Sequence, residues 1–232
     1  MGRDAEGVKK VAVVTGASSG IGAAIADRLE DAFSVQRVAR RGPVALDVAD
    51  QPAVARFVDS LERLDVLVCA AGDNIPERRL EQLTPEAWDR LLQVNLSGAF
   101  YFLQAALPKL RAAQGDAVFV ASVSGLWPDV SGPAYQAAKA GLIALSRAAG
   151  LELHGEGVRF TTVNPGVVDT PLLDKRPAPP AAEMRAKMLK PEDVADAVIA
   201  VLALPRRAWI PELTILPAQL QALGSTSSAP AR

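Results

Sequence analysis

The stretch that decides the fold is residues 11–22, VAVVTGASSGIG. Its first five residues form the β-branched, uninterrupted apolar run of a buried parallel strand, and a helical pattern covers residues 21–30. Glycines in the intervening turn let the backbone approach a phosphate, and a helix N-terminus offers free N–H groups with partial positive charge. The stretch predicts a strand–turn–helix unit that binds a pyrophosphate. The alternative is an ordinary strand-to-helix turn.

The alternation of strand and helix continues along the chain. It predicts strands over residues 35–39, 44–47, 65–70, 117–122, 159–164 and 212–216. It predicts helices over residues 52–64, 85–96 with a continuation to 110, 134–153 and 191–203. Such a pattern indicates a doubly wound parallel sheet, a Rossmann-like α/β fold in one domain over residues 1–223. The Pro- and Ala-rich residues 171–182 suit a lid, and residues 224–232 are expected to be a disordered tail.

Composition excludes several classes of protein. The 232 residues are half hydrophobic, which is enough for one large α/β domain, and the net charge of −1 creates no overall field for nucleic acid or an anionic membrane. One cysteine, Cys69, allows no intrachain disulfide, and no Cys/His cluster suggests a metal. With no secretory signal or membrane-spanning apolar run, we expect a cytoplasmic protein.

A catalytic group is predicted where several strands end. Tyr135 and Lys139 are four residues apart on the long helix and so share one face. A nearby ammonium should lower the pKa of the phenol toward the range of a proton-transfer catalyst. Ser122 ends a predicted strand and can bond a substrate oxygen, whereas Asn95 lies in an apolar helical segment where a buried amide needs partners. For Asn95 alone, a satisfied core amide or a helix-kink residue is the alternative role.

Thr15-Gly16-x-x-x-Gly20-x-Gly22, taken with the four side chains above, resembles the pattern of the short-chain dehydrogenase/reductase family over about residues 10–217. The resemblance implies hydride transfer between a nicotinamide and a carbonyl or alcohol carbon. It implies that Tyr135 is the general acid/base and that Ser122 orients the substrate. It further implies that Lys139 lowers the tyrosine pKa and bonds the nicotinamide ribose, while Asn95 holds a water in a proton relay.

The resemblance also implies the cofactor contacts, which follow the order of the chain. They are Gly16, Ser18, Ser19, Gly20, Ile21, Gly22, Asp47, Val48, Ala70, Ala71, Gly72, Tyr135, Lys139, Pro165, Gly166, Val168 and Thr170. The family's Asn-Asn-Ala-Gly element reads Cys69-Ala70-Ala71-Gly72 here, which removes a side-chain brace of the central sheet. We interpret Cys69 as a small buried hydrophobe.

Arg40 and Arg41 follow the second predicted strand, where family members that bind NAD(H) usually carry an acidic residue. Arginine suits the 2′-phosphate of NADP(H), so we expect NADP(H), with NAD(H) possible. The alternative is a solvated basic pair. Only five residues separate Arg41 from Asp47, where family members usually fit a helix, so the adenine side should be short.

The substrate pocket is expected to be largely apolar, with Trp127 and Leu172 beside Ser122 and Tyr135. Trp127 as plain packing is the alternative. Lys175 and Arg176 would anchor a carboxylate if the lid closed with them inward; otherwise they are solvated loop charges.

The resemblance implies a homodimer or homotetramer built on the helices near residues 95–110 and 134–153. A different class of function is a non-catalytic NAD(P)-binding redox sensor or scaffold on the same fold. Consumption of NADPH with a panel of carbonyl compounds separates that class from the enzyme. A sugar-nucleotide epimerase would need a second domain, for which the chain is too short.

Overall fold

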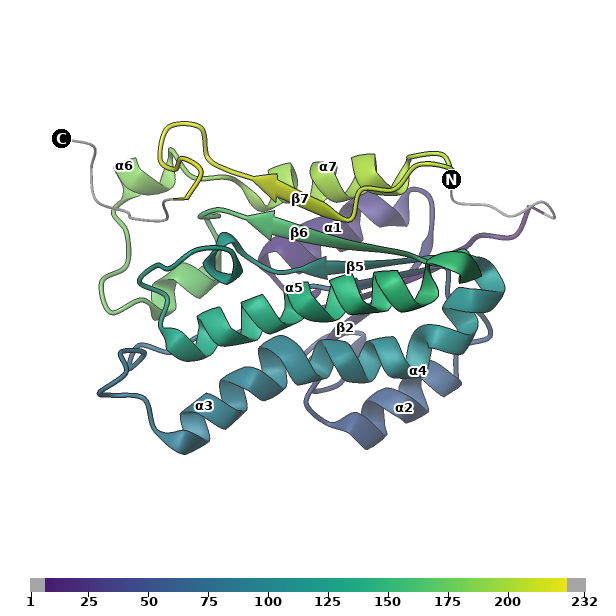
Figure 1. Cartoon of the computed structure of the whole chain (residues 1–232), viewed down its shortest axis with the longest axis horizontal. Helices are drawn as coiled ribbons and strands as arrows, with labels where there is room; N and C mark the ends of the chain where they lie inside the picture. The colour runs from purple at the N-terminus through teal and green to yellow at the C-terminus, as the bar shows by residue number, and fades with distance from the viewer. Residues whose placement is uncertain (1–6, 225–232) are drawn as a thin grey trace.

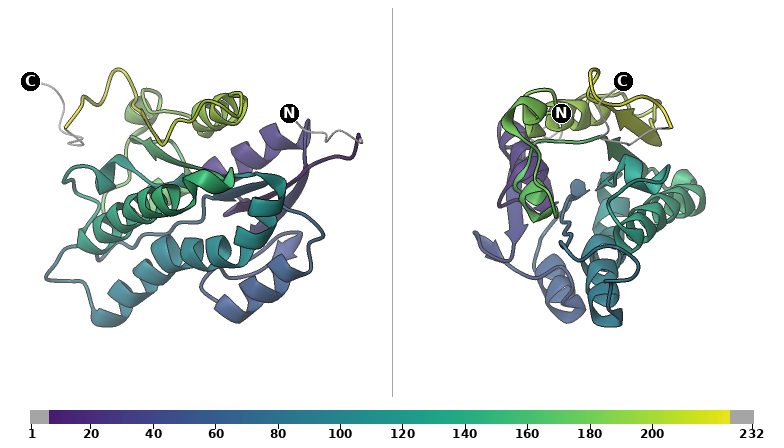
Figure 2. Two further views of the ribbon diagram at one scale, coloured as in Figure 1. Left: turned by 45° about the vertical axis from the view of Figure 1, so that its right-hand side comes forward. Right: turned by 90° about the vertical axis from the view of Figure 1, so that its left-hand side faces the viewer.

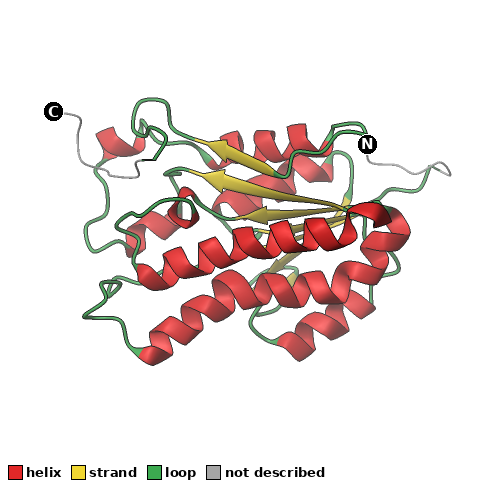
Figure 3. Cartoon of the chain, in the orientation of Figure 1, coloured by secondary structure: helices red, strands yellow, loops and turns green. Residues whose placement is uncertain are grey.

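A computed structural model describes residues 7–224, and the tail predicted over residues 224–232 lies, apart from Gly224, outside them. One sheet of seven parallel strands runs through the centre of the molecule, in the order β3-β2-β1-β4-β5-β6-β7 (Figures 1 and 3). The strands are β1 Val11–Thr15, β2 Ser34–Ala39, β3 Val44–Ala45, β4 Val66–Cys69, β5 Asp116–Val120, β6 Arg159–Pro165 and β7 Glu212–Ile215. The strand order reverses between β1 and β4, so the predicted doubly wound, Rossmann-like fold is confirmed.

Helices cover both faces of the sheet, as the two views of Figure 2 show. The helices are α1 Gly20–Glu30, α2 Gln51–Asp59, α3 Pro85–Leu92, α4 Gly98–Ala113, α5 Pro133–Leu153, α6 Ala182–Arg185 and α7 Pro191–Leu202. A π-helical turn, Gln93–Ser97, joins α3 to α4. Helices α1 and α7 lie on one face, and α2, α4 and α5 lie on the other (Figure 1).

The period of two in each strand divides the core into two clusters. Val13 of β1 packs with Leu67 and Phe119 beneath α2, α4 and α5. Its neighbours Ala12 and Val14 point the other way and pack beneath α1 and α7. Burial on both faces explains why the strands are apolar without alternation in the sequence.

Four predicted elements end or break differently from the sequence prediction. The helix predicted over residues 52–64 ends at Asp59, because the buried Leu64 belongs to the loop that leads into β4. The strand predicted over residues 44–47 keeps two residues. The strand predicted over residues 117–122 ends at Val120, because Ser122 caps the 3₁₀ turn Val123–Gly125 by accepting from Ser124 N at 3.1 Å. The helix predicted over residues 85–110 is interrupted by the π turn.

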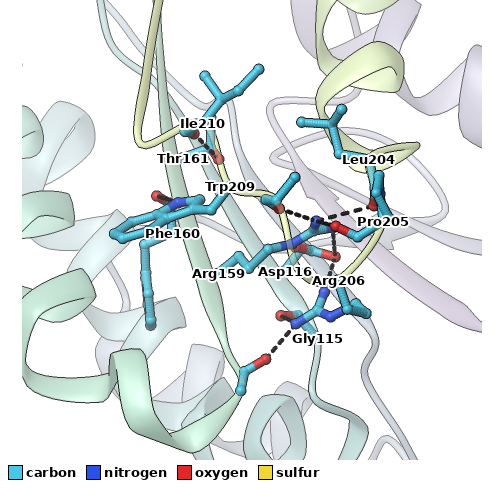
Figure 4. A network of polar contacts seen from close by, with 12 residues as sticks. Gly115, Asp116, Arg159, Phe160, Thr161, Leu204, Pro205, Arg206, Trp209 and Ile210 are labelled. Carbon is cyan, nitrogen blue, oxygen red and sulfur yellow. Dashed lines mark hydrogen bonds and ion pairs between the residues drawn. The ribbon is translucent and has the colours of Figure 1, made fainter.

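A polar network fastens the edge of the sheet where β5 and β6 begin (Figure 4). The Arg159 guanidinium donates to both carboxylate oxygens of Asp116, at 2.6 and 3.1 Å, and to the carbonyl of Ala208 at 2.9 Å. Arg206 donates to the same carboxylate at 3.0 Å. The indole N–H of Trp209 donates to Phe160 O at 2.8 Å. Ion pairs and hydrogen bonds thus connect the chain segments at this end of the sheet. The predicted site residues lie at the opposite end, where the strands finish.

Within residues 7–224, no helix combines the length and apolarity needed to cross a membrane. The same residues contain no group of three or more His, Cys, Asp or Glu side chains placed to hold a metal ion.

Candidate active site

The glycine-rich turn between β1 and α1 is packed so closely that two of its positions admit no side chain. Gly16 has a φ of +69°, and a Cβ there would lie 2.8 Å from the backbone nitrogen of Ala71. A Cβ on Gly22 would lie 2.4 Å from the Gly16 carbonyl oxygen. The first turn of α1 therefore sits directly on the loop, and its N–H groups, which have no helical partners, face the adjoining space.

Thr15 ties this turn to the end of β4. Its hydroxyl oxygen accepts from the backbone N–H groups of Ala70 and Ala71, both at 3.1 Å. These bonds hold the β4 loop against the turn even though both asparagines of the family element are replaced. Cys69 is 4% exposed, and burial raises the pKa of its thiol to about 12, so it is the small buried hydrophobe we expected.

One cleft opens over the glycine turn and extends to α5. Predicted residues that line it are Gly16, Ser18, Ser19, Gly20, Ile21, Gly22, Arg40, Asp47, Val48, Ala70, Ala71, Gly72, Tyr135, Lys139, Thr170 and Leu172. The sequence prediction missed Ala39, Leu46, Asp73, Arg90, Val94, Val120, Ala121 and Pro171, which also line it. Most of these residues follow a strand or lie beside a predicted contact. Their position at the carboxyl ends of the strands could therefore have indicated that they line the cleft.

The end of the cleft at β2 and β3 is short and basic. Arg40 lines it, whereas the exposed Arg41 does not. Asp47 accepts from Arg90 Nη2 at 2.8 Å and from Ala49 N at 3.0 Å. Burial opposes the charge of Asp47, but these two partners outweigh it and hold the pKa of the carboxyl below its ordinary value. No helix separates β2 from β3, as we expected for the adenine side.

Tyr135 and Lys139 line the other end of the cleft, and Ser122 lies near them outside its lining. Tyr135 and Lys139 lie one turn apart on α5, with Lys139 Nζ 5.6 Å from the centre of the phenol ring. Ser122 lies near enough to Tyr135 to lower the pKa of its phenol, and its hydroxyl donates to Ser124 Oγ at 3.1 Å. Lys139 is 3% exposed, and its ammonium donates to Val120 O at 2.9 Å. The structure thus brings together three of the four predicted catalytic side chains.

Burial dominates the protonation of this group. It raises the pKa of Tyr135 to about 12, with a contribution from the charge of Asp129, against the neighbouring Ser122 hydroxyl and the charges of Arg176 and Arg78. Burial also lowers the pKa of Lys139 to about 8. In the free chain the pKa of Tyr135 is raised overall and the Lys139 ammonium is turned toward Val120, so the lowering of the tyrosine pKa by Lys139 stays a prediction.

The fourth side chain, Asn95, lies in the π turn and is 1% exposed. Its amide nitrogen donates to the carbonyls of Leu91 and Asp73, both at 2.9 Å, and its oxygen accepts from Asp73 N at 3.1 Å. A Cβ on Gly72 would lie 3.1 Å from this oxygen and 3.6 Å from Lys139 Nζ. Asn95 and Lys139 therefore approach the same glycine, and the second lone pair of the amide oxygen can accept from a water.

A family model described as short chain dehydrogenase matches residues 38–180. The chain belongs to this family.

Named relatives and solved structures of similar proteins agree with this assignment. The chain is 36% identical to cis-4-hydroxycyclohexanecarboxylate dehydrogenase of Sinomonas cyclohexanicum, over 82% of this chain and 88% of the relative. It is similar to an alcohol dehydrogenase of Thermococcus sibiricus in complex with 5-hydroxy-NADP, with 31% identity, a TM-score of 0.78 and coverage of 89% and 95%. It is also similar to the closed form of a serine dehydrogenase in complex with NADP⁺, with 28% identity, a TM-score of 0.84 and coverage of 93% and 98%.

Three of the four contacts expected at the nicotinamide end of this short-chain dehydrogenase lie away from the cleft lining, which includes only Thr170 of that group. Pro165 is the last residue of β6, and Val168 is 7% exposed within the core. Gly166 is covered by the chain that follows β7, since a Cβ on it would lie 2.8 Å from Pro217 Cδ. The Gln221 side chain accepts from Val167 N at 2.6 Å in the same place.

Two charges lie near the substrate side of this short-chain dehydrogenase. Ser122 and Trp127 are outside the cleft lining, and the buried indole N–H of Trp127 has no partner among the described residues. Two arginines, Arg78 and Arg176, act electrostatically on Tyr135. The expectation of a largely apolar pocket stays a prediction, with these two charges beside it. Arg78 belongs to no helical or strand pattern in the sequence. Only its position in the loop after β4 could have indicated that it lies near the site.

Proposed function

We propose that this short-chain dehydrogenase is an NADP(H)-dependent oxidoreductase that transfers a hydride between the nicotinamide and a carbonyl or alcohol carbon of a small molecule. One observation carries the proposal. A single cleft joins the glycine-rich turn at one end to Tyr135 and Lys139 at the other. A dinucleotide held at the turn would place its reactive end beside the phenol.

The residues of the cleft fit a phosphorylated dinucleotide. The start of α1 suits the pyrophosphate, and the close approach of Ala71 to Gly16 leaves a smooth backbone wall beside it. Arg40 suits a 2′-phosphate, and the NADP ligands of the two similar solved structures support the same choice. NAD(H) fits the cleft as well, but it has no 2′-phosphate to pair with the Arg40 guanidinium. When bound, the nicotinamide supplies or accepts the hydride.

Tyr135 moves the proton. Because burial raises its pKa to about 12, the free chain holds it as the neutral phenol at neutral pH, ready to donate to a substrate oxygen. The Ser122 hydroxyl, which lowers the pKa of Tyr135, would donate to the same oxygen and fix its position. The reductive direction therefore needs no prior ionisation of the phenol.

Lys139 and Asn95 would supply and remove the proton of the phenol. With a pKa of about 8, Lys139 exchanges a proton near neutral pH, and it is placed to bond the ribose of the cofactor. Asn95 lies across Gly72 from Lys139, so a water on its free lone pair would continue the proton path toward solvent.

The substrate carries its reacting oxygen on carbon. The names of the relatives describe an alcohol, a hydroxycyclohexanecarboxylate and serine, each of which has a hydroxyl group that dehydrogenation converts to a carbonyl. Leu172 at the cleft and Trp127 near it would form the apolar wall.

We also propose that the protein acts in the cytoplasm as a homodimer or homotetramer paired through α4 and α5. Phe100 of α4 is 41% exposed, and Leu151 of α5 is 75% exposed, so these helices present apolar side chains to a second copy. The single cysteine suits a reducing compartment.

The test is Tyr135→Phe, which removes the hydroxyl and keeps the ring. Turnover of a panel of ketones, diketones and aldehydes with NADPH should fall by about 10² to 10⁴-fold, the usual contribution of a positioned general acid. NADPH affinity, measured by calorimetry, should stay within about threefold of the parent value, because the substitution removes only an uncharged hydroxyl contact.

The matched control is Tyr101→Phe, which removes the other tyrosine hydroxyl in the chain, at a half-buried position of α4. It should turn over the panel like the parent. Turnover by Tyr135→Phe within threefold of the parent would refute the proposed role. Tight NADPH binding by a parent chain that reduces nothing in the panel would favour the non-catalytic sensor.

A further inference from the structure

The loop after β4 buries an arginine whose charge is incompletely bonded. Arg78 is 7% exposed, and its Nη2 donates to Lys175 O at 2.8 Å. Its Nε is buried and has no hydrogen-bond partner among the described residues. Burying an unpartnered donor of a cation is costly, and such a group marks a place where a ligand completes the bonding.

The position of Arg78 is fixed relative to Tyr135. Gly132, three residues before Tyr135, has a φ of +92°, and a Cβ on it would lie 2.5 Å from the Arg78 carbonyl oxygen. Asn74 Nδ2 donates to Ser131 O at 3.0 Å and fastens the same loop to the start of α5. The guanidinium therefore sits on a support that also carries the catalytic phenol.

A second arginine approaches from the segment that follows β6. Arg176 is half-buried, and its side chain makes no hydrogen bond to the described residues. Burial lowers the pKa of Arg176 and of Arg78, and each guanidinium lowers the pKa of Tyr135 through its charge. Because Arg78 Nη2 donates to the carbonyl of Lys175, the residue before Arg176, the two arginines lie where the loop after β4 meets this segment, an arrangement that an anion stabilises.

The nearby carboxylates do not fully supply that anion. Asp129 accepts from the Ser124 hydroxyl at 2.5 Å and from Ser131 N at 2.8 Å, so its oxygens are used within its own loop. Asp73 is ion-paired with Lys175. With Asp129 counted against the two arginines, one net positive charge remains, which matches a singly charged group.

We infer that Arg78 and Arg176 bind a carboxylate of the substrate, so that the enzyme acts on a hydroxy acid or the corresponding oxo acid. The planar guanidinium fork matches the two oxygens of a carboxylate. The inference rests on the proposed oxidoreductase function, because the carboxylate is placed where it holds the reacting carbon near Tyr135. It names the substrate class of that site.

Binding tests the inference without requiring turnover. Calorimetry of the full chain, with and without NADPH, would compare acetate, benzoate and cyclohexanecarboxylate with their neutral amides. At least one carboxylate should bind about 10- to 100-fold more tightly than its amide, the range expected for charge-assisted bonds. Equal binding within all three pairs, or tighter binding of inorganic phosphate than of every carboxylate, would overturn the inference.

Variants separate an anchoring role from a structural one. Arg176→Met and Arg78→Met should reduce the preference for carboxylate over amide to about threefold or less, and Arg78→Lys covers the case in which Arg78→Met does not fold. Arg79→Met is the matched control, because Arg79 is the exposed neighbour in the same loop, and it should keep the full preference. A preference unchanged in Arg176→Met and in the folded Arg78 variant would exclude them as the anchor.

Turnover distinguishes failure of this inference from failure of the proposed function. With NADPH, 4-oxocyclohexanecarboxylate should have a kcat/KM at least about tenfold above that of its methyl ester, mainly through KM. Equal turnover of acid and ester would keep the oxidoreductase and exclude the anchor. Selective carboxylate binding by a chain that reduces no carbonyl compound would keep the anchor and refute the oxidoreductase.

Discussion

Lys139 is a buried cationic side chain whose charge the fold tolerates at a cost. The folded chain lowers its pKa from the ordinary value of 10.5 to about 8, chiefly through burial. Between these two values the unfolded chain binds more protons than the folded chain, so the free energy of unfolding must rise with pH across that window. The catalytic position is therefore maintained against a local electrostatic penalty that disappears in alkali.

We expect the free energy of unfolding of the parent to rise by about 2 to 3 kcal/mol from this residue between neutral pH and pH 10. Lys139→Met, which has no titrating group there, should lack this rise. Urea unfolding at several pH values checks it, and measurement should stop at pH 10, because Tyr135 has a raised pKa and lowers stability above that point.

Lys187→Met provides the control for this titration. Lys187 is exposed, so its removal should leave the slope of the parent unchanged. A rise in Lys139→Met as steep as in the parent would show that other groups produce it.

At the scale of elements, the end of β2 separates two adjacent arginines that the sequence could not distinguish. Arg40 is among the residues that line the cleft and Arg41 is not, although both side chains are exposed. The cofactor preference should therefore depend on one of the two.

Arg40→Asp should lower the ratio of NADPH to NADH catalytic efficiency by about 10- to 100-fold, as expected for loss of a charge-assisted bond to phosphate. Arg41→Asp is the matched control and should change the ratio by less than about threefold, since screened surface charges interact weakly. Steady-state kinetics with both cofactors measures the ratio. Equal effects of the two variants would contradict the assignment of the 2′-phosphate to Arg40.

At the scale of the whole molecule, the two ends of the sheet differ: a network of ion pairs and hydrogen bonds occupies one, and the candidate active site occupies the other. The network of Asp116, Arg159 and Arg206 lies where β5 and β6 begin, while the cleft lies where the strands end. Asp116 and Arg159 have side chains only 15% and 10% exposed, so breaking their pair leaves a poorly hydrated charge.

Arg159→Met should lower the free energy of unfolding by about 3 to 5 kcal/mol, the range for a buried pair that loses one partner. Activity per folded molecule should not change, because the network is remote from Tyr135. Urea denaturation together with turnover of the folded fraction checks both. Arg28→Met, which breaks the exposed pair with Asp196, should leave the midpoint unchanged, and an equal loss in both variants would contradict the argument.

The order of elements and most of the cofactor cleft could be predicted from the sequence, because strand apolarity and the glycine turn are local properties. Features that depend on tertiary placement could not. The side chain of Lys139 is directed by the position of Val120, and the backbone of Arg78 is placed against Gly132, 54 residues away. The π turn at Asn95 depends on bonds to Asp73, 22 residues away, so helical periodicity alone could not reveal it.

The buried thiol of Cys69 has a practical consequence for spectroscopy. With its pKa near 12 and little access for reagents, the chain's only cysteine should not react with maleimide dyes under native conditions. A cysteine introduced at the exposed Ala178, two residues beyond Arg176, would then be the one labelled position. A fluorophore on Ala178→Cys would show whether this segment moves when NADPH binds, without any further engineering of the protein.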